Sequence, residues 1–411
     1  MTSTGQGQRP PATVLAVVTF LAAGALVALW TRGHLGVPGN PRASGYYGLQ
    51  DFRDAIYYPA VAVLEGHNPY DAADFVRRYP VATPMRPYLP ALLWLYLPLG
   101  FLPYTTAGAI FFALNLVLVL VLVHQAFRLT GLAPTAPRVL GLAALVVLSR
   151  PGLLTLFVGQ SAIYMTLGVY VALRYARTRP ALSALGVALV GAKPTFGLPL
   201  GFLLLARGEW RPAVLGGVLV GLASAVAAVP MVHAAGGLGA WGTSIAASAN
   251  MSDDPHNLIL QSYFRVDAPS LVGRLFQAEL SPAVQALLLA LVVALGAAAV
   301  WRLARAPDSP ASLSASIVCL TTLACVYHQT YDCLLLLAPL LASVSGTLGS
   351  GRWRWLLATL LVVPFVNYFA TLTVIHALGI EGAAWMLVAS LNAAAVAGAF
   401  LLLLREADPR H

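Results

Sequence analysis

Long apolar runs recur from one end of this sequence to the other, and mostly short polar stretches separate them. Thr13–Trp30, Ala107–Phe127, Ala283–Val300 and Ala384–Leu404 are each close to the length of about 20 residues that a membrane-spanning helix needs. Only 9% of the 411 residues are charged and 59% are hydrophobic, whereas roughly a quarter of a soluble domain is charged. These features exclude a soluble fold and predict an all-α polytopic membrane protein.

Several other apolar runs are too short to cross a bilayer alone. We expect a bundle of about 11–13 membrane segments in a single integral-membrane domain, residues 1–411, with long loops at 32–88 and 231–282. Prolines bound the short run Leu89–Leu102. The topology given below needs this run to be re-entrant or interfacial, and full crossing would change the parity of the next few helices. The first apolar run lacks a convincing cleavage site and is interpreted as a retained helix.

Most of the positive charge lies in short loops that contain arginine. Such loops accumulate on the cytoplasmic side of a membrane, which predicts a multi-pass protein of the cell membrane with both termini cytoplasmic and both long loops outside. The net charge of +9 is spread over these loops and does not indicate nucleic-acid binding. The basic loops are Arg174–Arg179, Arg207–Arg211, Arg302–Arg305 and Arg352–Arg354.

Under this topology, the most unusual polar residues of the chain fall on the outer face. A charged group beside apolar membrane segments is costly and usually faces a cavity or a partner. We therefore expect a functional site where these residues meet. They are Asp51, Asp54, Gln160, Lys193, Asn250, His256, His328 and Asp332.

Asp51 and Asp54 lie in a tyrosine-rich polar stretch that also contains Arg53 and Tyr57. They are three residues apart, so a helix would place both on one face. A carboxylate at a cleft beside the membrane can act as a general base on a sugar or lipid hydroxyl. A helix cap or a salt bridge to Arg53 is the structural alternative.

Lys193 is the only lysine and precedes Pro194 at a break in an apolar region. It could bind a phosphate and stabilise negative charge on a departing phosphate, or it could mark a membrane edge by snorkelling. His328 and Asp332 are four residues apart and would share a helix face. They could bind hydroxyls or a phosphate, or they could cap a helix.

Residues with a possible metal or cofactor role do not form an established motif. Asp253, Asp254 and His256 lack a known ligand spacing, and the three cysteines form no CxxC pair. The sequence also lacks a P-loop and a GxGxxG fingerprint. We therefore expect neither a metal nor a cofactor.

Five weak motifs follow one another between Asp51 and Pro339. They are Asp51-Phe52-Arg53 with Gly66-x-Asn68-Pro69-Tyr70, Pro87-x-x-Pro90 with Leu97-Pro98-Leu99, Gly159-Gln160, Gly191-Ala192-Lys193-Pro194, and His328 ahead of Leu334–Pro339. Together they resemble glycosyltransferase family 87, within the GT-C membrane glycosyltransferases, whose members include polyprenyl-phosphate-mannose-dependent α-mannosyltransferases and an arabinofuranosyltransferase. The family's Gly-Gln-Asn reads Gly159-Gln160-Ser161 here.

The resemblance implies a GT-C-type fold and an inverting transfer on the outer face. A sugar, expected to be mannose, would pass from a polyprenyl-phosphate donor to a hydroxyl of a lipid or glycan acceptor. The family's general base corresponds to Asp51, with Asp54 as the substitute, and its lysine-proline position to Lys193. Further substrate-binding candidates are Gln160, His328, Asp332, Arg53, Tyr57, Asn250 and His256.

A secondary transporter or lipid flippase is the main alternative from another class, and a non-catalytic assembly partner is a third. A transporter needs polar groups along a path through the middle of the membrane. Here the polar groups are expected at one edge, beside two long loops, which favours an enzyme.

Overall fold

The computed structural model describes residues 10–35, 48–86, 88–249, 258–306, 310–349 and 351–408. Throughout these ranges the regular structure is helical, and the only β pairing is two isolated bridges, Leu35 with Gly48 and Arg265 with Gln329. The predicted all-α fold class is therefore confirmed.

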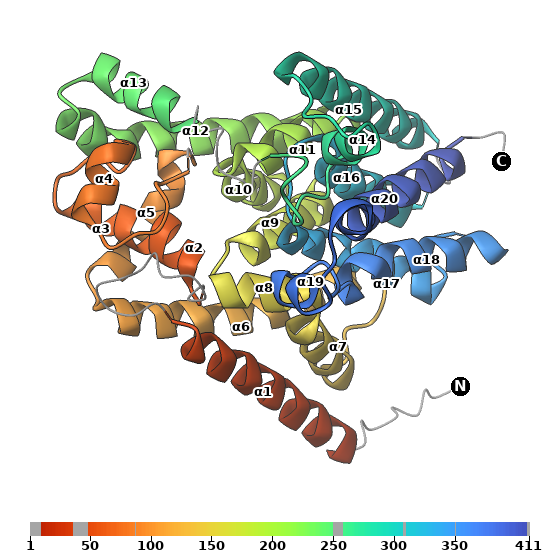
Figure 1. Cartoon of the computed structure of the whole chain (residues 1–411). Coiled ribbons are helices and arrows are strands. Elements are labelled where there is room, and N and C mark those ends of the chain that lie inside the picture. Colours follow the sequence, from red (N-terminus) through yellow and green to blue (C-terminus); the bar gives the residue numbers. More distant parts are fainter. Residues whose placement is uncertain are drawn as a thin grey trace.

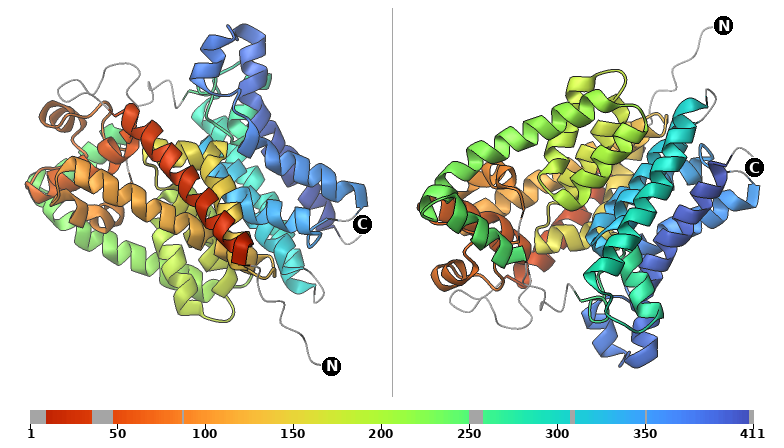
Figure 2. Two further views of the ribbon diagram at one scale, coloured as in Figure 1. Left: turned by 90° about the horizontal axis from the view of Figure 1, so that it is seen from below. Right: turned by 90° about the horizontal axis from the view of Figure 1, so that it is seen from above.

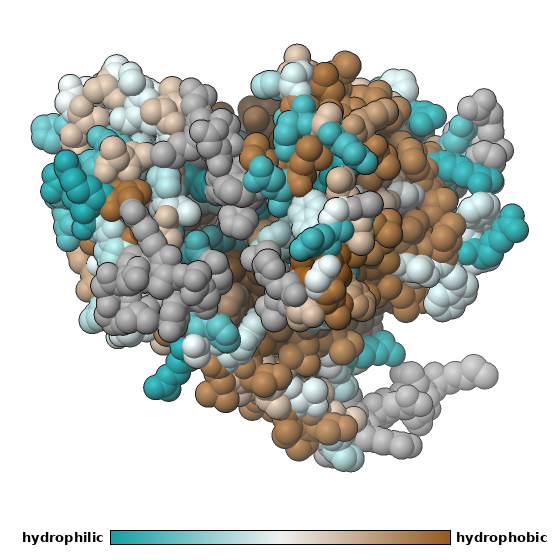
Figure 3. Space-filling view, viewed as in Figure 1, coloured by the Kyte–Doolittle hydropathy of each residue, from teal (hydrophilic) through white to brown (hydrophobic). Residues whose placement is uncertain are grey.

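Five long helices in the described part of the chain are long and apolar enough to cross a membrane. At about 1.5 Å per residue, each extends for about 36–39 Å. Hydrophobic side chains cover the outward faces of several of them, as Figure 3 shows for α1 and for the side of the molecule formed by α15. The five are α1 (Pro10–Gly33), α6 (Tyr104–Leu129), α12 (Trp210–Ala234), α15 (Pro282–Arg305) and α20 (Gly382–Glu406).

A sixth possible span is broken. α7 (Ala136–Leu148) and α8 (Arg150–Val158) meet at an angle of 70°. Ser149 ends the first helix and caps the second, since its hydroxyl accepts a hydrogen bond from the Gly152 N–H at 3.3 Å. The bend directs α8 toward the interior of the bundle, where its last residues precede Gln160.

The remaining apolar helices are short and lie between the long ones. They extend for about 14–23 Å, less than the hydrocarbon thickness of about 30 Å. α5, within the run Leu89–Leu102, is too short to cross alone. These helices are α5 (Pro90–Gly100), α9 (Ala162–Tyr175), α10 (Pro180–Gly191), α11 (Pro194–Ala206), α16 (Ala311–Cys325), the 3-10 helix η2 (Thr330–Leu336) and α17 (Leu337–Ser345).

The short helices form hairpins that start and end at the arginine-rich end of the bundle. Arg177, between α9 and α10, and Arg207, after α11, both contact Glu209, at 3.2 and 3.1 Å. The tip of the α10–α11 hairpin is Lys193, which therefore lies at the opposite end. Each arm is about 18–20 Å long, about 10 Å less than the hydrocarbon thickness of a bilayer.

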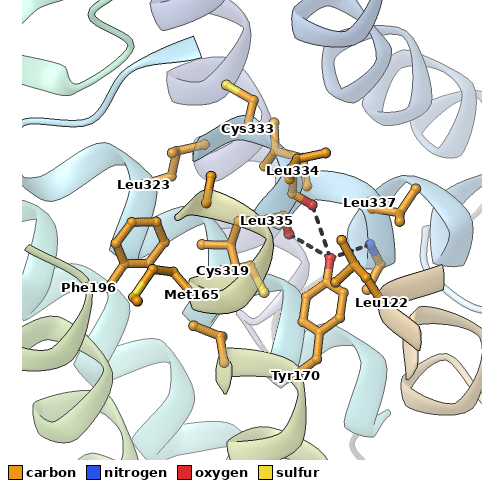
Figure 4. Close-up of a cluster of buried hydrophobic side chains, with 14 of the residues drawn as sticks. Leu122, Met165, Tyr170, Phe196, Cys319, Leu323, Cys333, Leu334, Leu335 and Leu337 are labelled. Carbon is orange, nitrogen blue, oxygen red and sulfur yellow. Dashed lines mark hydrogen bonds between the residues drawn. The ribbon is translucent and has the colours of Figure 1, made fainter. Parts of the chain in front are cut away.

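Buried contacts fix the second hairpin, α16 to α17, against α9 (Figure 4). The Tyr170 hydroxyl accepts a hydrogen bond from the Ala338 N–H at 2.8 Å and contacts the Leu335 carbonyl at 3.0 Å. Tyr170 and Leu335 are completely buried. This contact holds η2, and with it Asp332, at a fixed height in the bundle.

The two long loops contain helices of their own, and the views in Figures 1 and 2 place α2–α5 and α13 in a lobe away from α18 and α20. Tyr70 and Phe75 pack in this lobe with Trp241 and Ile245. α12 continues past Pro230 to Ala234, so the second loop starts later than predicted. The loop helices are α2 (Gln50–Phe52), the π-helix η1 (Arg53–Tyr57), α3 (Tyr58–Leu64), α4 (Ala72–Arg78), α13 (Leu238–Ala249) and α14 (Ala268–Leu275); α18 (Gly351–Val366) and α19 (Leu372–Ala377) follow later.

Candidate active site

The acidic turn α2–η1 packs directly against the end of α8. The Leu49 N–H donates to the Phe157 carbonyl at 2.7 Å, and Phe52 is completely buried. Gly159 has a φ of +76°, and a Cβ atom there would lie 2.5 Å from the Phe52 Cβ. Only glycine permits this approach without strain, and the approach brings Asp51 to Gln160.

Asp51 is half-buried, and only one of its carboxylate oxygens has a hydrogen-bond partner among the described residues. Gln160 donates from Nε2 to Oδ2 at 3.0 Å, and the same nitrogen contacts the Tyr331 hydroxyl at 3.2 Å. Burial and the neighbouring Asp54 charge raise the pKa of Asp51 to about 6, against the opposing effects of Arg86, Gln160 and Lys193. Oδ1 is left free to accept a proton from a hydroxyl.

Asp54 is, in contrast, fully occupied. Its carboxylate pairs with Arg53 at 2.7 Å and accepts hydrogen bonds from the Ala82 and Thr83 N–H groups, each at 3.1 Å, and from the Thr83 hydroxyl at 3.2 Å. These contacts tie η1 to the segment that follows α4. The salt bridge considered as a structural alternative is present for Asp54 and Arg53, which favours Asp51 over Asp54 as a base.

Lys193, Asp332 and His328 form a buried chain of contacts. Lys193 Nζ donates to Asp332 Oδ1 at 3.2 Å, and His328 Nδ1 lies 3.0 Å from Asp332 Oδ2. Asp332 also caps η2, because its Oδ2 accepts the Gln329 N–H at 3.1 Å. The Asp332 carboxylate therefore caps η2 and pairs with Lys193 and His328 at the same time.

Aromatic rings enclose this charged group. Lys193 Nζ lies 5.0 Å from the centre of the Phe196 ring and 5.4 Å from that of Tyr331. The His328 ring meets Phe196 edge-on at 4.4 Å, and its buried Nε2 has no hydrogen-bond partner among the described residues. The ammonium uses one N–H for Asp332, so its other donors can serve a ligand.

Two of the predicted site residues bind neighbouring parts of the chain instead. Arg53 is used by Asp54, and the Tyr57 hydroxyl donates to the Leu102 carbonyl at 2.7 Å, so both side chains hold the acidic turn in place. Asn250 and His256 lie outside the described residues.

Two further residues belong to the cluster and were not predicted. The Tyr331 hydroxyl contacts Gln160, and its ring flanks Lys193. The Arg86 charge acts on Asp51. Arg86 lies in the long loop 32–88 that also contains Asp51, and Tyr331 lies between His328 and Asp332, but no residue pattern distinguished them from structural side chains.

The cluster joins four distant segments at the tips of the short helices. Asp51 comes from α2, Gln160 from the α8–α9 turn, Lys193 from the α10–α11 tip, and His328 and Asp332 from the segment before and within η2. It pairs a free carboxylate oxygen with a buried cation, as proton removal from a hydroxyl beside an anionic leaving group requires. Within the described ranges, no group of three or more His, Cys, Asp or Glu residues could hold a metal ion.

Comparison with known proteins gives one match. The model of glycosyltransferase family 87 matches residues 87–328, more than half of the chain. The matched region contains Gln160, Lys193 and His328, and it begins after Asp51 and ends before Asp332. No curated protein and no solved structure matches the chain.

Proposed function

Because the chain belongs to glycosyltransferase family 87 and is therefore a membrane glycosyltransferase, we propose that it transfers mannose from a polyprenyl-phosphate donor. The acceptor is a hydroxyl of a lipid or glycan on the outer face of the cell membrane. The convergence of Asp51 and Lys193 in one cluster, from segments 142 residues apart, is the observation that carries this proposal.

Asp51 is the general base of this reaction. Gln160 orients its carboxylate through Oδ2, so Oδ1 receives the proton of the acceptor hydroxyl. The acceptor oxygen then attacks the anomeric carbon on the face opposite the phosphate. One carbon–oxygen bond forms as the bond to the phosphate breaks, and the configuration of the sugar inverts.

Lys193 stabilises the leaving group. The donor is a phosphodiester with one negative charge, and departure creates a phosphate monoester with a second. A preorganised ammonium in a site of low polarity stabilises this developing charge. Asp332 and His328 hold the ammonium in position, and the surrounding rings exclude water.

The short helices explain how a lipid-linked donor reaches these residues. Their tips end about 10 Å below the far membrane surface, at a depth where a phosphate on an isoprenoid chain can approach from the bilayer. Cytoplasmic basic loops and termini would place these tips on the outer side, where a glycan acceptor enters from water.

Transfer from polyprenyl-phosphate-mannose by the purified protein in detergent tests this proposal. The wild-type protein is expected to release polyprenyl phosphate and form a mannosylated acceptor, and Asp51→Asn is expected to do neither at a comparable rate. Full activity of Asp51→Asn would remove Asp51 from the mechanism. Transfer from a nucleotide sugar but not from the lipid-linked sugar would overturn the donor assignment.

A further inference from the structure

A second buried cation lies outside the cluster that contains Asp51 and Lys193. Arg150 is the first residue of α8 and is only 5% exposed. Among the described residues, its single hydrogen bond runs from one terminal nitrogen to the Ala370 carbonyl at 3.2 Å, and its Nε is buried without a partner. Its guanidinium also lies 5.8 Å from the centre of the Phe264 ring.

This arrangement is unfavourable as a purely structural feature. The start of a helix carries a partial positive charge, which disfavours a cation in the first turn. A guanidinium has five N–H donors, and no carboxylate of the described chain forms a salt bridge with Arg150. A buried, unneutralised arginine and a helix N-terminus together favour an anion, and a phosphate matches the planar fork of the guanidinium.

The position of Arg150 connects the bilayer to the candidate active site. Phe264, which packs on its guanidinium, accepts a hydrogen bond at its carbonyl from Thr330, the first residue of η2, at 3.2 Å. α8 then leads from Arg150 to Gln160 over about 14 Å. Arg150 therefore lies at the start of α8, and Gln160 of the candidate active site lies just past its end.

The segment that leads to the Ala370 carbonyl, residues 366–369, has exposed apolar side chains. Val366 and Phe369 are each 59% exposed, just before the Ala370 carbonyl that Arg150 contacts. The Tyr368 hydroxyl donates to the Leu148 carbonyl, so this segment adjoins the bend between α7 and α8. A buried cation beside an exposed apolar segment suits a ligand with an anionic head and a hydrocarbon chain.

We propose that Arg150 is the phosphate-binding residue of an entry site for the isoprenoid phosphate lipid, with the lipid chain along residues 366–369. This inference rests on the proposed function, because it assigns the route by which the lipid-linked donor enters. The guanidinium binds the lipid phosphate before it moves to the cluster that contains Lys193.

The first experiment measures binding of polyprenyl monophosphate to the full-length protein in detergent by native mass spectrometry. Arg150→Gln is expected to weaken binding about ten- to hundredfold, the effect of losing hydrogen bonds to a charged group, and Arg150→Lys to weaken it less. Arg207→Gln is the matched control, because Arg207 is also a buried arginine but lies at the opposite end and pairs with Glu209. Wild-type affinity in Arg150→Gln, or an equal loss in Arg207→Gln, overturns the proposal.

A second measurement leaves Arg150 intact, in case Arg150→Gln does not fold. Phe369→Trp places a fluorophore on the exposed segment, and polyprenyl monophosphate is expected to shift its emission at concentrations where polyprenol and inorganic phosphate do not. An equal response to polyprenol would exclude a role for the phosphate. An equal response to phosphatidylglycerol vesicles would exclude selection of an isoprenoid lipid.

The two hypotheses fail in different ways. Arg150-dependent binding of the lipid phosphate without any sugar transfer would refute the proposed function and leave the entry site standing. Sugar transfer with lipid binding that is independent of Arg150 would refute the entry site alone.

Discussion

The long outer helices and the short central helices share an apolar composition but have different roles. α12 crosses with its side chains largely exposed toward lipid, whereas α10 and α11 are short and meet at a buried lysine. Each arm of this hairpin is shorter than the hydrocarbon thickness of a bilayer, so its tip can lie at a depth that water reaches only through the protein. The difference shows how a membrane enzyme can place polar chemistry at lipid depth without exposing polar groups to lipid.

The most severe test of this difference is the removal of the Asp51 carboxylate from the cluster at the tips of the short helices. Asp51→Asn keeps the shape and the Gln160 contact of the side chain but cannot take a proton, so transfer is expected to fall by about 10²–10⁴. Initial rates of mannosyl transfer, with the thermal unfolding midpoint measured in parallel, check this. Asp54→Asn is the matched control.

Asp54→Asn should lower the stability of the fold rather than remove a catalytic group, because Asp54 pairs with Arg53 and accepts hydrogen bonds from the backbone of residues 82–83. It is expected to lower the unfolding midpoint more than Asp51→Asn does. If Asp54→Asn abolished transfer at an unchanged midpoint while Asp51→Asn remained active, the roles of the two carboxylates would have to be exchanged.

The next largest effect is expected at the tip cation. Lys193→Met leaves Asp332 as a buried charge without its ammonium, and breaking a buried pair in this way costs about 3–5 kcal/mol. The double variant Lys193→Met with Asp332→Asn is expected to recover much of the stability and none of the transfer. Thermal unfolding and transfer rates separate the two losses, and a double variant with restored transfer would contradict a role for Lys193 at the leaving phosphate.

A smaller effect is expected from pH. The pKa of Asp51 is raised to about 6, and a general base works only when deprotonated, so transfer should fall about tenfold per pH unit below that value. The folded protein binds this proton more tightly than the unfolded chain, so acidification through pH 6 stabilises the fold at this group. Activity should therefore be lost before the protein unfolds, and a flat rate profile down to about pH 4.5 would exclude Asp51 as the base.

The sequence predicted the helical class and much of the cluster for different reasons. Apolar run length alone identified the long helices, and the arginine loops set the parity that placed Gln160 and Lys193 at the same end. The sequence-based end of α12 at Pro230 was too early. Proline usually ends helices in water, but it is better tolerated in a membrane helix.

The sequence could not separate Asp51 from Asp54. Both are aspartates on the same turn, and their difference comes from residues 82–83 and 160, which contact them only in the folded chain. Tyr331 was missed because its contacts also form only in the folded chain. A tyrosine near a membrane edge is, from sequence, more often an interfacial anchor.

The smallest effect is expected on the outward face of a long helix. Leu222 on α12 is 62% exposed, so Leu222→Ala removes mainly contacts with lipid and is expected to change the free energy of unfolding by less than about 0.5 kcal/mol. Leu203 on α11 is completely buried, and the same substitution there leaves a cavity and is expected to cost about 2–5 kcal/mol. Unfolding in one detergent compares the two. A large loss in Leu222→Ala would mean that another protein surface, such as a second copy of the chain, covers α12, and the division between lipid-facing outer helices and packed central helices would then have to be redrawn.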